Sequence, residues 1–96
     1  MREWKPLAEN KGILSLVYPK EDVIKAQFNL GLMYYNGRGV IQDNVYAHMW
    51  WNIAASSGYK DASKNRDKVA KKMNPAELSK AKMLARECVR KNYKVC

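Results

Sequence analysis

Apolar side chains recur along most of this chain at the three- and four-residue spacing of amphipathic helices. The pattern predicts helices over residues 25–35, 45–57 and 60–73, and a last helix from residue 74 toward residue 93. A further short helix is expected over residues 4–10. No segment alternates with period two for long, so strands are not expected. The inward stripe of the 25–35 helix consists of Ala26, Leu30, Met33 and Tyr34.

Helix-boundary signals agree with this periodicity. Gly37 and Gly39 supply a sharp turn after the helix over residues 25–35, because glycine readily adopts left-handed backbone conformations. Asp43 or Asn44 can cap the next helix, and Gly58 ends it. The run from Asn74 to Glu77 is a strong helix start, with Asn as N-cap, Pro at the first position and Glu at the third. The sequence therefore predicts an all-α fold with short turns.

The charge of the chain is concentrated at one end. The 96 residues contain eighteen basic and nine acidic side chains, for a net charge of +9. Residues 61–96 hold eleven of the basic and four of the acidic side chains, and so carry +7 of that charge. This asymmetry suggests a surface that faces a polyanion or an acidic partner, although a basic surface can also serve solubility alone.

Candidate chemistry is sparse. His48 is the sole histidine, and the two cysteines, Cys88 and Cys96, form no Cys-x-x-Cys pair, so no metal site is expected. On a continuous helix these cysteines would lie about 80° apart and more than two turns along the axis. They could pair only if the chain turned back before Cys96, so we expect a buried Cys88 and a frayed, free Cys96. We expect His48 to be a partly exposed surface residue and the chain to be non-catalytic, without a cofactor.

The sequence also contains an internal repeat. Trp50, Ala54 and Gly58 are spaced four residues apart, as are Trp4, Ala8 and Gly12. Ala26 precedes Ala62 by 36 residues, the length of one helix–turn–helix unit with its loops. The earlier unit is interrupted by about ten extra residues within residues 13–22.

These residues resemble the Sel-one-like repeat, a relative of the tetratricopeptide repeat, in its pattern A-x-x-x-L-G-x-x-Y-x-x-G-x-G-V-x-x-D…A-x-x-W-x-x-x-A-A-x-x-G. The resemblance implies a short α/α solenoid of about two and a half helix–turn–helix repeats. It divides the single domain 1–96 into a half repeat (1–12), an insertion (13–22), a complete repeat (23–58) and a capping helix pair (59–96). Arg66 and Asp67 depart from the pattern, as a terminal repeat can. The matching structural positions are Ala26, Leu30, Gly31, Tyr34, Gly37, Gly39, Ala47, Trp50, Ala54, Ala55, Gly58 and Ala62.

The resemblance implies a protein–protein interaction module whose concave surface is lined by the first helix of each pair. We expect Gln27, Asn29 and Tyr35 to contact the partner on that surface. Trp51 and Tyr35 lie one position away from the buried stripe, so we expect both to be exposed, and Trp51 is a further candidate for contact with the partner. The partner is another protein of unknown identity, and a homodimer is left open because two and a half repeats are few for independent stability. The apolar segment within residues 13–22 could pack on the first helix pair or mediate such self-association.

The alternative function is binding of nucleic acid or another polyanion by two rows of basic residues at i, i+4 spacing. If both rows face one side, they form a patch of about seven charges. Otherwise they are the solvent-exposed faces of the terminal helices and bind no partner. No apolar run is long enough to span a membrane or to form a signal-peptide core, so we expect a cytoplasmic protein with no membrane partner. The rows consist of Lys64, Lys68 and Lys72, and of Lys82, Arg86, Arg90 and Lys94.

Overall fold

The computed structural model of the chain describes residues 20–94 and Cys96. These residues form four helices and no strand, which confirms the all-α prediction. The helix expected over residues 4–10, and most of the insertion, lie outside the described residues. The helices are α2 (Glu21–Asn36), α3 (Asn44–Ser56), α4 (Lys60–Ala70) and α5 (Pro75–Arg90).

The predicted helix boundaries are confirmed where capping residues set them. The Asp43 carboxylate accepts hydrogen bonds from the backbone N–H groups of Val45 and Tyr46, at 2.8 and 3.2 Å. Asn74 and Glu77 form a reciprocal capping box at the start of α5. Where the sequence gives no such signal, the boundaries differ. Helix α2 begins at Glu21, so residues 21 and 22, which we assigned to the insertion, are helical.

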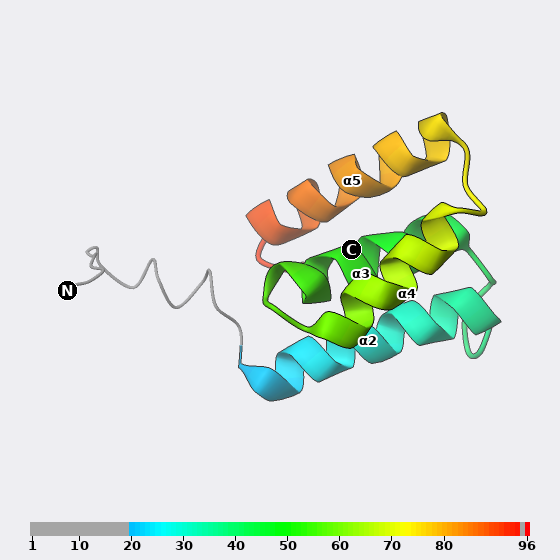
Figure 1. Ribbon diagram of the computed structural model, residues 1–96. Helices are drawn as coiled ribbons and strands as arrows, with labels where there is room; N and C mark the ends of the chain where they lie inside the picture. Colours follow the sequence, from blue (N-terminus) through cyan, green and yellow to red (C-terminus); the bar gives the residue numbers. More distant parts are fainter. Residues whose placement is uncertain (1–19, 95) are drawn as a thin grey trace.

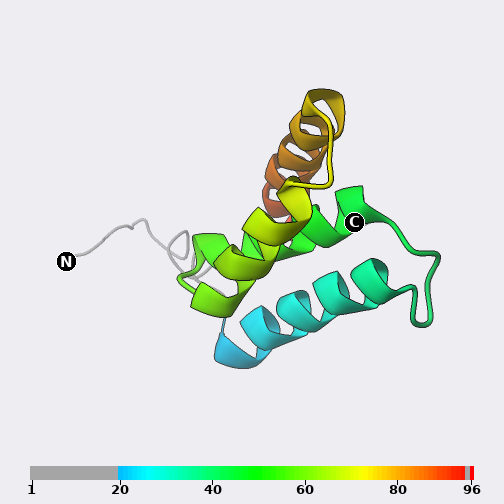
Figure 2. The same ribbon diagram turned by 45° about the vertical axis from the view of Figure 1, so that its right-hand side comes forward.

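Helix α3 is the centre of the fold. It packs against each of the other three described helices, and α2 and α5 lie on opposite sides of it (Figures 1 and 2). In chain order the described helices form two successive pairs, α2 with α3 and α4 with α5. The pairs pack together through α3, and α4 packs little against α5 itself. The connections are short because glycines with positive φ reverse the chain after α2 and after α3, at Gly37 and Gly58.

The core contains two clusters of buried side chains, one on each side of α3. The first lies toward α2 and α4 and is centred on Trp51, which is 2% exposed; the second lies toward α5 and is centred on Met49 and Ile53. The half-buried ring of Tyr34 packs against both clusters and stacks on Tyr46 at a centroid distance of 5.3 Å. Completely buried alanines, Ala47 and Ala54 among them, allow the helices to approach closely.

The inward face predicted for α2 is wrong at two positions. Ala26 and Met33 are exposed, and the buried residues of α2 are Gln27 and Gly31. Helix α3 covers only one side of α2, and that side passes through residues 27 and 31. Ala26, a position of the repeat pattern, therefore takes no part in the packing between α2 and α3.

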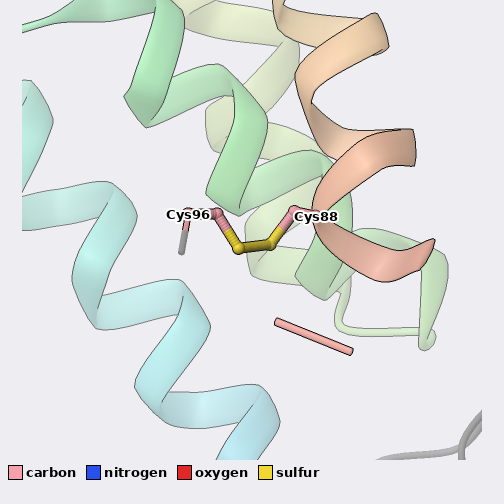
Figure 3. The surroundings of a disulfide bond; sticks show 2 residues. All are labelled: Cys88 and Cys96. Atoms are coloured by element: carbon pink, nitrogen blue, oxygen red, sulfur yellow. A yellow bond between two sulfur atoms is a disulfide. The ribbon is translucent and has the colours of Figure 1, made fainter. Parts of the chain in front are cut away.

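A disulfide bond joins Cys88 to Cys96, which corrects the expectation of a free thiol at Cys96 (Figure 3). The chain turns back directly after α5, since Asn92 and Tyr93 both adopt left-handed conformations, with φ of 58° and 64°. The N–H of Tyr93 then donates to the carbonyl of Cys88 at 2.8 Å. This reversal leaves the two Cα atoms 5.6 Å apart, within the ordinary range for a disulfide.

Candidate functional site

A depression of about 210 Å³ lies between α2 and α4, the first helices of the two pairs. This surface, the α2–α4 groove, is where we expected a partner to bind. Its lining combines three apolar or aromatic side chains with two carboxamides and an ammonium group. The lining residues are Leu32, Tyr35, Asn36, Trp51, Asn65 and Lys68.

Trp51 forms the floor of the α2–α4 groove and is buried, so its predicted exposure is wrong. The indole Nε1–H donates to the backbone carbonyl of Phe28 at 3.1 Å, which satisfies the polar atom of the ring. The indole lies against the backbone of α2 at Gly31, where any side chain would occupy the same space. Trp51, which lies one position away from the predicted buried stripe, is therefore central to the packing of α3 on α2.

Tyr35 lies half-buried on the wall of the groove, with its ring centroid 5.6 Å from that of Trp51. The Nζ of Lys72 donates to the Tyr35 hydroxyl at 2.7 Å and lies 5.1 Å from the ring centroid. Lys72, which follows the end of α4, thus contacts the ring of Tyr35 on α2. One edge of the groove therefore carries the positive charges of Lys68 and Lys72.

Asn29 is exposed on α2, seven residues before Asn36 and hence on the same stripe of the helix. Asn29 does not itself line the groove and lies about two turns before Asn36, toward the start of α2. Gln27, by contrast, is only 3% exposed, and neither its Oε1 nor its Nε2 has a hydrogen-bond partner among the described residues. The expectation that Gln27 contacts a partner at the surface is therefore wrong.

The two basic rows do not line the same depression. Lys68 lines the α2–α4 groove, whereas Lys82, Arg86 and Arg90 line depressions between α5 and α3. Lys64 is exposed one helical turn before Lys68, and Lys94 is exposed beyond the end of α5. The four row residues that line a depression are thus divided between the α2–α4 groove and the two depressions beside α5.

His48 is 3% exposed, so the prediction of a partly exposed histidine is wrong. Burial lowers the pKa of His48 below its ordinary value of 6.5, and the cations Arg66 and Lys82 lower it further, against a smaller opposing effect of Asp67. The imidazole is therefore neutral at pH 7. Within residues 20–94, no cluster of three histidine, cysteine or carboxylate side chains is placed to hold a metal ion. No helix in this part of the chain is long and apolar enough to cross a membrane.

Comparison with known proteins identifies the repeat. The family model described as the Sel1 repeat matches residues 24–59, a range that contains most of α2 and all of α3. No curated protein matches the chain significantly. Sel1 repeats form helical solenoids like those of tetratricopeptide repeats, are typically non-catalytic and generally mediate contacts between proteins. Residues 24–59 are therefore a Sel1 repeat.

Proposed function

We propose that this chain is a non-catalytic adaptor that binds a segment of another protein in the α2–α4 groove. The observation that carries this proposal is the composition of the groove, which places Tyr35 and the carboxamides of Asn36 and Asn65 over a floor formed by Trp51. Carboxamides can both donate to and accept from a peptide backbone, and a half-buried aromatic ring supplies apolar contact area. The groove is formed by the first helix of each pair, the surface that the family resemblance assigns to partners.

The separation of the two basic rows supports a protein partner over a nucleic acid. A polyanion bound along its backbone gains affinity from many charges on one continuous surface. Here Lys68 and Lys72 border one hollow and the α5 row borders another. Each hollow combines its charges with apolar or carboxamide groups, a mixture that suits a peptide.

Capture of partners tests the proposal. The immobilised chain is incubated with lysate of its source, with and without nuclease, beside the variant Asn36→Asp. We expect a discrete protein that survives nuclease and is lost with Asn36→Asp, because a new carboxylate would alter the polarity of the groove. Ser79→Asp, which places the same charge at an exposed position of α5, is the matched control. Captured material that disappears with nuclease would establish the polyanion alternative instead.

The disulfide bears on the compartment in which this adaptor works. Disulfides persist in oxidising compartments and are rare in the cytoplasm, where thiols are kept reduced. We therefore propose that the chain works in an oxidising compartment and not in the cytoplasm, which was the expectation from its apolar runs. The pairing of Cys88 with Cys96 supports this proposal.

A further inference from the structure

Two depressions lie end to end along α3, on the side that faces α5, and they share Asn52. One, of about 410 Å³, is bounded by Ile53 and by Arg86, Val89 and Arg90 of α5. The other, of about 310 Å³, is bounded by His48, by Arg66 of α4 and by Lys82 of α5. We call these two depressions together the basic trough. We infer that the basic trough is a second binding surface, which takes an extended acidic segment of another protein that also carries an apolar side chain.

The charge of the trough selects an acidic occupant. Four cationic side chains line it, Arg66, Lys82, Arg86 and Arg90, against the single carboxylate of Asp67. Arg66 is held in place, because its Nη1 donates to Asn52 Oδ1 at 3.0 Å and its Nε to Asp67 Oδ1 at 3.1 Å. The three cations of α5 are exposed, so the positive charge faces the solvent along the whole length of the trough.

The depression of about 410 Å³ is the apolar half of the trough, and that of about 310 Å³ is its polar half. The apolar half favours an occupant with an aliphatic side chain. Val89 is 44% exposed between the two flanking arginines, above the buried side chains of Ile53 and Ala85. An aliphatic side chain of a partner would cover this valine while its neighbouring carboxylates meet the guanidinium groups. The combination of apolar floor and charged edge is typical of anchored peptide contacts.

The spacing along α5 sets the geometry of the occupant. Residues four apart on a helix rise by about 6 Å, so Lys82 lies about 12 Å from Arg90 along the axis. An extended peptide advances about 3.3 Å per residue, with alternate side chains on one face. Val89 lies about 10 Å from Lys82 along this axis. An acidic residue two positions from an apolar residue lies about 7 Å from it, and the long side chains of a glutamate, Arg86 and Lys82 cover the remaining distance between the two depressions.

None of the described side chains that line the trough is a phenylalanine, tyrosine or tryptophan. Single-stranded nucleic acids are held by base stacking on such rings as well as by charge. The trough supplies charged, polar and aliphatic groups without these rings, which favours a peptide over an oligonucleotide. This inference rests on α3, α4 and α5 and does not depend on the α2–α4 groove.

His48 provides the signal that reports binding. It is the only histidine of the chain, so its ring protons give one set of resonances. Its Nδ1 is buried without a hydrogen-bond partner among the described residues, and the ring lines the polar half of the trough beside Arg66 and Asp67 of α4 and Lys82 of α5. A carboxylate that enters this half would favour the protonated ring and raise its pKa.

The test is an NMR titration of the full chain with two probe peptides, acetyl-valyl-seryl-glutamate amide and its glutamine counterpart. We expect the glutamate probe to shift the His48 ring and the amides of Asn52 and Arg86 saturably, and to raise the apparent pKa of His48. Its dissociation constant should be at least fivefold lower than that of the glutamine probe. Arg86→Gln and Lys82→Gln should each weaken binding at least threefold, while Lys80→Gln, which removes an equal charge outside the trough, should leave it unchanged.

Four outcomes would overturn the inference. Equal affinity for the two probes would show that the trough does not recognise the negative charge of the glutamate. Equal weakening by Lys80→Gln would show that the attraction comes from the net charge of the chain. An octathymidylate that shifts the same resonances more tightly than the glutamate probe would assign the trough to polyanions. Absence of any saturable shift at millimolar probe would likewise contradict it.

Discussion

The backbone of Gly31 on α2 lies directly against the indole ring of Trp51 on α3. A Cβ atom at residue 31 would come within 2.8 Å of Trp51 Cε2, and closer still to Cδ1 and Nε1. The indole Nε1–H of Trp51 donates to the backbone carbonyl of Phe28, so α2 fixes both the position of the ring and its polar atom. This pairing explains why the repeat needs glycine at that position.

The variant Gly31→Ala should therefore destabilise the fold. Alanine is favoured over glycine within a helix by about 1 kcal/mol, so a purely local effect would be stabilising. Overpacking costs typically about 1–3 kcal/mol, so we expect a net loss of about 1 kcal/mol in the free energy of unfolding. Urea denaturation followed by tryptophan fluorescence measures it. Asn29→Ala, at an exposed position of the same helix, is the control and should change stability little. A stabilised Gly31→Ala would contradict the packing described.

Gln27→Leu should stabilise the protein. The carboxamide of Gln27 is buried, and neither of its polar atoms has a partner among the described residues. A buried unsatisfied polar group costs about 1–3 kcal/mol, which an apolar side chain of similar volume avoids. Chemical denaturation should show a gain of about 1 kcal/mol. A loss of similar size would show that the carboxamide is hydrogen-bonded after all.

The stability should fall as the pH falls below about 6.5, through His48. Its pKa is lowered in the folded state, chiefly by burial, so the unfolded chain binds more protons in this range. Protonation therefore favours unfolding. Above the pKa of the unfolded chain the imidazole is neutral in both states, so His48 adds no pH dependence to the stability there. Urea denaturation near pH 7.5 and near pH 5.5 should show the loss, and His48→Gln should reduce it. An equal pH dependence in both proteins would assign the effect to other groups.

Cys96→Ser should lower the stability by about 2 kcal/mol, because the disulfide closes a short loop at the end of α5. The oxidised protein should show no reactive thiol in a colorimetric assay, and mild reduction should release two. Reduction of the wild-type protein should reproduce the stability of Cys96→Ser. Two reactive thiols in protein isolated without reductant would contradict both the pairing and the oxidising compartment that we propose.

The sequence predicts the helices well where local physics determines them. Asp43 and Asn74 cap their helices as expected, and Gly37 ends α2 as expected, because capping and chain reversal depend on a few adjacent residues. The wrong predictions concern which face of a helix is covered. Periodicity suggested an exposed Trp51 and an inward Ala26, whereas the position of α3 against α2 buries Trp51 and Gln27.

The candidate sites were predicted only in part, for a related reason. Tyr35 and Lys68 do line the α2–α4 groove. The pKa of His48, by contrast, is lowered in part by Arg66 and Lys82, which other helices place beside it. The disulfide depended on two left-handed residues after α5, Asn92 and Tyr93, neither of which is glycine. Left-handed conformations at such residues are uncommon, so the sequence pattern gave no signal for this reversal.

The central claim, that the α2–α4 groove binds a protein partner, is tested most directly by site-specific photo-crosslinking. A photoreactive residue replaces Asn29, on the same stripe of α2 as the groove-lining Asn36, in one variant. In another it replaces Ser79, which is exposed on α5 and lines neither the groove nor the basic trough. We predict that lysate of the source yields one discrete crosslinked protein with the variant at residue 29 and none with that at residue 79. Equal crosslinking from both positions, or crosslinking from residue 79 alone, would contradict the claim.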